Sequence, residues 1–268
     1  MDLGLQGRRA FVAGSSSGIG SGIARKLGSE GVEVIVHGRD AKSAEAVVAE
    51  IRADGGKAIS ILGRLDDMQD VERLARDALA TGPIDILINS AGACPDVHPW
   101  FEVPIDNWHR QYQLSTVYAV QLIRAFVPPM RERGWGRVLN FGSVGALQPL
   151  TNHPDYLAAK LALHSVTTSL ARELGNCGVT VNILVSGLVM TENTKAAFRR
   201  FGAAGGVPEN DPEWERRVLQ LIGATIPLDR GAELDEMAAA ACFLVSEPAA
   251  YIHGASLRVD GGGSGFPI

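Results

Sequence analysis

Three residues that can handle protons and carbonyl oxygens stand close together in the sequence: Ser143, Tyr156 and Lys160. The stretch from Pro154 to Ala162 is rich in Ala and Leu, and proline suits the first helical position, so a helix is expected to begin there. Residues four apart on a helix share one face. The phenol of Tyr156 and the ammonium of Lys160 would therefore point into the same space.

This arrangement predicts acid/base chemistry on an oxygen atom. A tyrosine normally releases its proton near pH ~10, and a neighbouring positive charge lowers that pKa. Lowering the pKa by about 3 units takes roughly 4 kcal/mol, which one ammonium at about 4 Å supplies at an effective dielectric constant of ~20. A hydroxyl such as Ser143 would hold a substrate oxygen while Tyr156 exchanges a proton with it. The alternative is that Tyr156 and Lys160 form an ordinary surface contact on a helix.

Composition narrows the class of protein. The chain has 268 residues, a net charge of −5, 46% apolar and 21% charged residues, which is ordinary for a globular protein. No cluster of basic residues in the sequence indicates a nucleic acid or an anionic membrane as partner. Three widely spaced cysteines form neither a disulfide framework nor a metal-ligand cluster. With no signal-peptide layout at the start, and the longest apolar stretch (237–245) too short to cross a bilayer, a cytoplasmic protein is expected.

Short apolar runs alternate with helical patterns along the chain. The predicted strands are 9–13, 32–36, 58–62, 84–88, 138–141, 179–185 and 256–259. The predicted helices are 18–30, 42–53, 68–80, 105–133, 154–174 and 233–246. This alternation predicts an α/β fold with a doubly wound parallel sheet, in one domain spanning 1–268. The region 191–228 breaks the alternation and is expected to be a substrate lid.

A glycine-rich turn between the first strand and the first helix predicts a phosphate site. Phosphate binding needs close approach to backbone N–H groups and to the positive end of a helix. The turn residues expected to bind cofactor are Gly14, Ser16, Ser17, Gly18, Ile19 and Gly20. The spacing differs from the common G-x-G-x-x-G pattern, and a purely structural turn is the alternative.

Two further strand ends bear on the cofactor. Small residues after the fourth strand, Asn89, Ala91 and Gly92, leave room for a ligand, unless they are a simple turn. After the second strand, the guanidinium of Arg39 matches a 2′-phosphate, which favours NADP over NAD, while Asp40 is expected to cap the next helix. The alternative is that Arg39 is a solvated charge and that Asp40 binds the ribose of NAD.

Together these residues resemble the short-chain dehydrogenase/reductase family over nearly the whole chain. The matching motifs are the turn at 14, 18 and 20, Asn89–Gly92, Ser143 with Tyr156 and Lys160, Ser186–Thr191, and Val259–Gly262. The resemblance implies a single Rossmann-type domain with seven parallel strands and helices on both faces. It also implies assembly into homotetramers or homodimers.

The resemblance also implies roles. Tyr156 would be the general acid/base, Lys160 would lower its pKa and hold the nicotinamide ribose, and Ser143 would orient the substrate carbonyl. Asn89, Ala91 and Gly92 would line the cofactor site. Val189 and Thr191 would contact the nicotinamide end.

Three residues depart from the family pattern. Ser115 stands seven residues after Trp108, where the family commonly has an asparagine that supports a proton relay. Arg64 stands where an aspartate that contacts the adenine is expected. Ser186 replaces the proline expected before Gly187.

The predicted function is an NADP-dependent oxidoreductase that interconverts a ketone and a secondary alcohol. Segments 94–100, 145–155 and 191–228 are expected to face a largely apolar substrate. Their large apolar residues are Trp100, Leu147, Leu150, Phe198, Phe201 and Trp214, which in the alternative only pack the lid. No metal is expected.

Two other functions stay open. One is a 3-oxoacyl thioester reductase, whose acidic acyl-carrier protein would dock on arginines. The candidates are Arg124, Arg131, Arg133 and Arg172. The other is a non-catalytic dinucleotide-binding regulatory protein, which the departure at Ser115 suggests.

Overall fold

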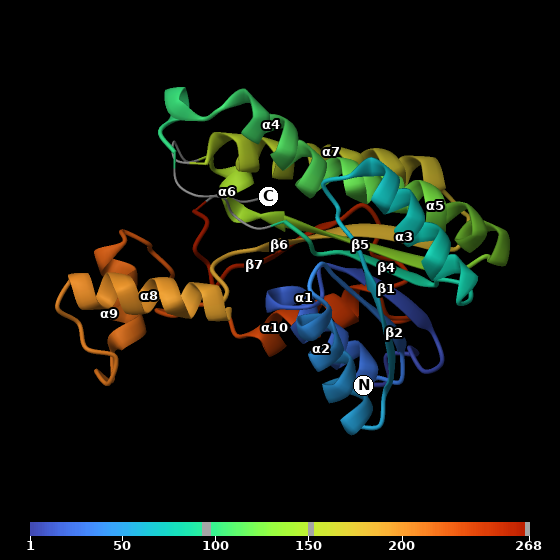
Figure 1. Cartoon of the computed structure of the whole chain (residues 1–268), viewed down its shortest axis with the longest axis horizontal. Coiled ribbons are helices and arrows are strands. Elements are labelled where there is room, and N and C mark those ends of the chain that lie inside the picture. The colour runs from blue at the N-terminus through green and yellow to red at the C-terminus, as the bar shows by residue number, and fades with distance from the viewer. Residues whose placement is uncertain (93–97, 150–152, 266–268) are drawn as a thin grey trace.

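The computed structural model describes residues 1–92, 98–149 and 153–265. It shows a seven-stranded parallel sheet with helices on both faces (Figure 1). The strand order is β3-β2-β1-β4-β5-β6-β7, so the chain winds outward in one direction from β1 and then in the other from β4. The predicted Rossmann-type doubly wound α/β class is confirmed.

Each strand comes from one of the predicted apolar runs. The strands are β1 (Arg9–Ala13), β2 (Glu33–Gly38), β3 (Lys57–Leu62), β4 (Ile86–Asn89), β5 (Gly136–Ser143), β6 (Val179–Ser186) and β7 (Ser256–Val259). The inner strands are buried along almost their whole length because helices cover both faces of the sheet. The predicted bounds of β2 to β6 differ from the observed bounds by one or two residues, whereas those of β1 and β7 agree.

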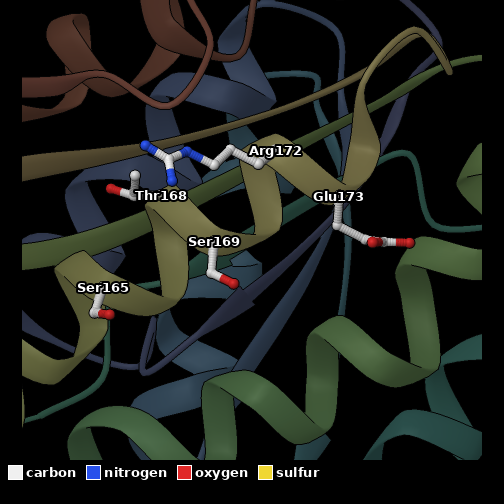
Figure 2. A pocket seen from close by; sticks show the side chains of 5 residues that line it. All are labelled: Ser165, Thr168, Ser169, Arg172 and Glu173. Atoms are coloured by element: carbon white, nitrogen blue, oxygen red, sulfur yellow. The ribbon is translucent and has the colours of Figure 1, made fainter.

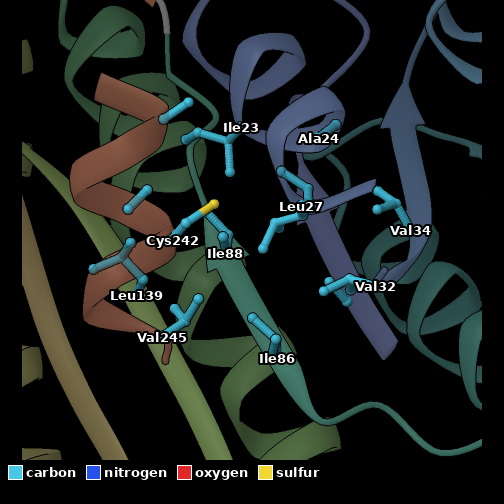
Figure 3. Packing of buried hydrophobic residues seen from close by; sticks show 14 of the residues in the cluster. Ile23, Ala24, Leu27, Val32, Val34, Ile86, Ile88, Leu139, Cys242 and Val245 are labelled. Atoms are coloured by element: carbon cyan, nitrogen blue, oxygen red, sulfur yellow. The ribbon is translucent and has the colours of Figure 1, made fainter. Parts of the chain in front are cut away.

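Two hydrophobic layers hold the helices to the sheet. One face carries α1 (Gly18–Ser29), α2 (Ala41–Ala53) and α10 (Leu234–Leu244). The other carries α3 (Met68–Ala80), α4 (Ile105–Tyr112), α5 (Tyr118–Arg133) and α7 (Pro154–Leu174). In Figure 3, Leu27 of α1 and Cys242 of α10 pack over Ile88 of β4. This packing fixes where the strands end, and therefore where a ligand site can form.

The predicted helix 105–133 is interrupted. A π-helical turn, η2 (Gln113–Val117), separates α4 from α5. Such turns insert an extra residue and are frequent at functional sites. The helical periodicity of the sequence did not reveal this turn, because the apolar pattern resumes after it.

The region 191–228 forms a separate small layer. It contains α8 (Glu192–Ala204) and α9 (Trp214–Leu221), which extend away from the sheet in Figure 1. Phe198, Val218, Leu219 and Met190 form its own apolar core. The chain enters and leaves this layer through adjacent segments, since Val189 pairs with Ala232 in an isolated bridge. Two further short helices are η1 (Trp100–Glu102) and α6 (Val144–Leu147).

At the amino ends of the strands, a buried arginine is held by several partners. Arg137 is 2% exposed, donates to the carbonyls of Gly136 and Ser246, and pairs with Glu247 at 3.4 Å. Trp135 stacks between Arg137 and Arg8, at 4.4 Å and 3.6 Å from the guanidinium carbons to the ring centre. Its indole N–H donates to Glu247 at 2.7 Å. At this edge of the sheet, the positive charge of the buried arginine is therefore paired with the carboxylate of Glu247.

Among the described residues, none of the helices combines the length and the apolar character needed to cross a bilayer.

Candidate active site

The ammonium of Lys160 lies buried at the carboxyl edge of the sheet. Nζ donates to the carbonyl of Phe141 in β5 at 2.8 Å and to that of Ala91 after β4 at 3.4 Å. Lys160 is only 3% exposed, and burial lowers its pKa to about 8. Within the described ranges no carboxylate lies within ion-pair distance of it. Burying an ammonium without a counter-charge is costly, so this lysine destabilises the fold that holds it.

Tyr156 lies on the same side of α7 as Lys160. The lysine Nζ is 5.9 Å from the centre of the tyrosine ring. Pro154 occupies the start of the helix, as expected, and the half-buried phenol follows within the first turn. The two side chains therefore point to the same side of the helix, as predicted. Their separation allows the cation to act on the phenol.

Ser143 is brought to this edge by β5. It is the last residue of that strand and lies in register with Ser186, the last residue of β6. Phe141, which binds Lys160, lies two residues earlier in the same strand. The strand therefore delivers both a carbonyl for the lysine and a half-buried hydroxyl near the start of α7.

Ser115 lies inside the π-helical turn and is fully buried. Its Oγ has no hydrogen-bond partner among the described residues. The turn also brings a backbone carbonyl toward the lysine: a Cβ placed on Gly92 would lie 3.2 Å from Lys160 Nζ and 3.5 Å from the carbonyl oxygen of Leu114. An unsatisfied buried hydroxyl costs free energy unless water reaches it.

The glycine turn forms a cradle at the end of β1. Gly14 has φ 76°, and a Cβ there would lie 2.8 Å from Cα of Ala91. A Cβ on Gly20 would clash with the carbonyl oxygen of Gly14. Side chains are excluded at both positions, so the backbone of the turn is closed onto the loop after β4 and onto the start of α1.

The N-terminus of α1 has the features of an anion site. Its N-cap, Ser17, makes no side-chain capping bond, and the first turn carries no acidic residue. The N–H groups of Gly18, Ile19 and Gly20 are first-turn donors without intrahelical acceptors. A phosphate would satisfy these donors and the positive end of the helix dipole.

The loop after β4 lies beside this cradle. Asn89 is fully buried; its amide donates to Asn140 at 2.8 Å, while its own Oδ1 has no partner in the described part of the chain. Ala91 contacts the glycine turn and binds Lys160 through its carbonyl. The loop thus joins the glycine turn to the lysine.

The two arginines at the neighbouring strand ends differ in their surroundings. Arg39 follows β2 and is exposed, and Asp40 caps α2 by accepting from the N–H of Ser43 at 2.7 Å, as predicted. Arg64 follows β3 and is already paired with Asp66, at 3.0 Å and 2.9 Å. In the described structure, Arg39 has the more available guanidinium.

The start of the small layer formed by residues 191–228 lies against the glycine turn. Thr191 caps α8 by accepting from the N–H of Thr194, and its methyl lies 3.7 Å from the position of a Cβ on Gly18. Val189 is buried in the core beside the sheet. These two predicted residues therefore lie at the same edge as Lys160 and the turn.

The expected substrate-facing aromatics divide into two groups. Phe198 is 2% exposed and packs edge-on against Trp214 at 5.9 Å, inside the small layer of residues 191–228. Trp100 and Phe201 are about half exposed, at 53% and 51%. Segments 93–97 and 150–152, including Cys94 and Leu150, lie outside the described residues. In the part described, no group of three His, Cys, Asp or Glu side chains has the arrangement of a metal site.

One residue of this edge was missed by the sequence analysis. His37 in β2 is 2% exposed and contacts the glycine turn directly. The available signal was a histidine in an otherwise apolar strand, immediately before Gly38 and Arg39.

Comparison with known proteins identifies the class. A family model described as enoyl-(acyl carrier protein) reductase matches residues 13–264. The D-threitol dehydrogenase of Mycolicibacterium smegmatis is 33% identical over 263 residues, 97% of this chain and 94% of that protein. The 3-oxoacyl-(acyl-carrier-protein) reductase FabG of Pseudomonas aeruginosa is 32% identical over 268 residues, covering 97% and 98%. The L-sorbose reductase of Gluconobacter frateurii, solved with NADPH and L-sorbose, matches with a TM-score of 0.90 at 28% identity and covers 100% of both chains.

The fold and these matches place the chain among the oxidoreductases with a Rossmann-type sheet. It belongs to the short-chain dehydrogenase/reductase family. The predicted family and the predicted enzyme class, a dehydrogenase/reductase, are both confirmed. The predicted cofactor, NADP, agrees with the NADPH of the sorbose reductase structure.

Proposed function

We propose that this protein is an NADP-dependent oxidoreductase that interconverts a ketone and a secondary alcohol, with Tyr156 as the acid/base. The observation that carries the proposal is the buried ammonium of Lys160, which lacks a carboxylate partner in the described structure and lies 5.9 Å from the Tyr156 ring. Burying an unpaired ammonium costs free energy of folding. This cost is explained if the charge shifts the pKa of a neighbouring catalytic group.

The residues present fit a dinucleotide. The cradle at Gly14 and Gly20 excludes side chains, and the uncapped start of α1 offers N–H groups to a phosphate. We propose that Ser16, Ser17, Gly18 and Ile19 hold the phosphates, that Asn89 and Gly92 line the site, and that Val189 and Thr191 border its far end. When bound, the cofactor supplies or accepts a hydride.

In this proposal, residues of the chain itself transfer the proton and orient the substrate carbonyl. Ser143 donates its hydroxyl to the substrate oxygen and holds it beside Tyr156. Tyr156 gives its phenolic proton to that oxygen during reduction and takes it back during oxidation. Lys160 stabilises the phenolate through its charge. We propose that Ser115 takes the place of the family's asparagine by holding a water, which accounts for its unpartnered buried hydroxyl.

Selection of NADP is assigned to Arg39. Its guanidinium is exposed at the end of β2, whereas that of Arg64 is engaged by Asp66. The former is therefore the better placed of the two to bind a 2′-phosphate. Arg39→Ala should weaken NADPH binding about tenfold or more while leaving NADH binding nearly unchanged.

The proposed class of substrates includes both apolar and polar ketones. A largely apolar substrate was predicted from the lid aromatics, but Phe198 and Trp214 are used inside the lid. Trp100 and Phe201 keep exposed surface for a ligand. Relatives named for polyols and ketoses add polar candidates, so a test panel has to span both kinds.

A second candidate is a 3-oxoacyl thioester reductase, favoured by the similarity to the FabG protein. Three of the four arginines expected to dock its carrier protein are badly placed for this. Arg131 and Arg133 end α5 at the amino edge, where Arg133 pairs with Asp85, and Arg172 lies near the C-terminal end of α7. Figure 2 shows Arg172 beside Thr168 in a polar hollow on α7. Lys160 lies twelve residues earlier in the same helix. This placement favours a small free substrate.

The organisation of the protein is part of the proposal. We propose one functional domain over 1–268, with 191–228 as the substrate lid. Assembly into a homotetramer or homodimer and a cytoplasmic location stay predictions from the sequence.

The test is a spectrophotometric assay. Purified protein is mixed with NADPH or NADH and a panel of apolar ketones, diketones, ketoses and 3-oxoacyl thioesters, and loss of reduced nicotinamide is followed. We expect turnover of a free ketone with NADPH. No turnover across the panel would overturn the proposed reaction, and preference for NADH would overturn the assignment to Arg39.

A further inference from the structure

His37 joins the glycine turn to the loop after β3. Its Nδ1 accepts the N–H of Gly14 at 3.0 Å, and its Nε2 lies 3.2 Å from the carbonyl oxygen of Gly63. A backbone amide can only donate and a carbonyl can only accept, so these partners fix one neutral tautomer with the proton on Nε2. Burial lowers the pKa of His37 to about 4, which keeps this tautomer neutral near pH 7.

The backbone of the same residue holds the rest of the turn. The carbonyl of His37 accepts the N–H groups of Ser15 at 2.8 Å and Ser16 at 3.2 Å. Its N–H donates to Ser15 Oγ at 2.9 Å, which in turn donates to the carbonyl of Val12 at 2.6 Å. His37 thus binds the donors of the first half of the turn and leaves those at the start of α1 to a ligand.

The loop on the other side is fixed in the same way. The N–H of Gly63 donates to the carbonyl of Gly38 at 3.0 Å, and the N–H of Arg64 donates to Asp70 at 2.6 Å. The charged groups that face the imidazole are Asp70 and Arg73 of α3 and Arg39 after β2. None of these three side chains hydrogen-bonds to the ring, whose two nitrogens are taken by Gly14 and Gly63.

We propose that His37 is a positioning residue for the cofactor, one that sets the distance between the glycine turn and the Gly63–Arg64 loop. This inference rests on the proposed function, because it assumes that the cofactor binds against both segments. Without the imidazole, the Gly14 N–H and the Gly63 carbonyl lose their partners in a buried place. Ala91 closes one side of Gly14, where even a Cβ would lie 2.8 Å from the Cα of Ala91, so we expect the freed turn to shift toward the space proposed for the phosphates.

The chain offers a matched control in His253. Its Nδ1 accepts the N–H of Val181 at 3.2 Å, and its Nε2 lies 2.7 Å from the carbonyl oxygen of Ala171. The two imidazoles therefore make the same pair of backbone bonds. His253 makes them in the amino half of β6, away from the carboxyl edge.

The experiment compares cofactor affinity with stability. The dissociation constants of NADPH and NADP⁺ are measured by titration for the wild type and for His37→Leu, His37→Asn, His37→Gln and His253→Leu, together with urea unfolding midpoints. His37→Leu should weaken binding about tenfold, the effect of about one lost hydrogen bond. Asn places an amide oxygen where Nδ1 was and should restore affinity to within about threefold, because it can accept from Gly14. Gln reaches toward Gly63 instead and should restore less.

The control separates positioning from general stability. His253→Leu should lower the unfolding midpoint about as much as His37→Leu while leaving both dissociation constants unchanged. Equal weakening by the two leucine variants, or wild-type affinity in His37→Leu, would overturn the inference. If His37→Leu does not fold, equal affinities of the Asn and Gln variants would overturn it instead. A wild type that binds neither nucleotide would refute the proposed function, which is a separate outcome.

Discussion

The two edges of the sheet each bury a cation, and they treat it differently. At the amino edge, Arg137 has Glu247 as counter-charge, several carbonyls as acceptors and Trp135 stacked on it. At the carboxyl edge, Lys160 has two carbonyls and, in the described structure, no carboxylate. Burial lowers the pKa of both groups, to about 8 for Lys160.

This difference separates stability from function. A buried charge with its full set of partners holds segments together, and removing it is destabilising. In the proposed function, a buried charge without a counter-charge acts on a neighbouring group, which is the phenol of Tyr156.

Replacing the lysine should have the largest effect on activity. Lys160→Met is expected to lower kcat by a factor of about 100 or more, because the phenol then keeps its ordinary acidity. Its free energy of unfolding should stay within about 1 kcal/mol of the wild type, since an unmatched buried charge is removed with it. Steady-state kinetics measure the change in kcat, and urea unfolding measures the change in the free energy of unfolding. A stability loss matching the activity loss would contradict the comparison.

The same substitution at the other edge should give the opposite result. Arg137→Met is expected to lower the free energy of unfolding by about 3 kcal/mol, since three carbonyls and Glu247 lose their partner. The kcat of the folded fraction should be unchanged, because this edge is remote from Tyr156. A loss of kcat without a loss of stability would show that the amino edge takes part in the reaction.

Much of this comparison was predictable from the sequence. The features that could not be predicted have physical reasons. The strand ends that carry Gly14, Asn89 and Ser143 follow from apolar runs bounded by small residues. The spacing of Tyr156 and Lys160 on one helix predicted their common face. The π-helical turn at Ser115 was not predictable, because one extra residue leaves the helical pattern on either side intact. The bonds of His37 and the placement of Arg133 depend on register and on which end of a helix meets which sheet edge, and a single sequence does not give these.

Stability should depend on pH through Lys160. Its pKa is about 8 in the fold and 10.5 as the ordinary value. Between these pH values the unfolded lysine holds a proton that the folded one has lost, so the unfolded state binds more protons and stability rises with pH. Relative to Lys160→Met, the wild type should gain about 3 kcal/mol between pH 8 and pH 10.5. Urea unfolding of both proteins at several pH values measures this, and a flat difference would mean that the lysine is not buried as a cation.

The smallest effect is expected at Ser115. If its hydroxyl holds a relay water, Ser115→Ala should lower kcat about three- to tenfold with little change in cofactor affinity, and Ser115→Asn should keep most of the rate. The solvent isotope effect on kcat should change in the alanine variant. Identical kinetics in all three proteins would place the relay elsewhere.

The acidity of the Tyr156 phenol tests the account most directly. Ultraviolet difference spectra recorded against pH report phenolate formation for the four tyrosines of the chain. The account predicts one tyrosine that ionises clearly below pH ~10, and predicts that this transition disappears in Tyr156→Phe and moves upward in Lys160→Met. If the wild type and Tyr156→Phe give the same spectra below pH ~10, the buried ammonium does not make this phenol acidic, and the proposed mechanism is wrong.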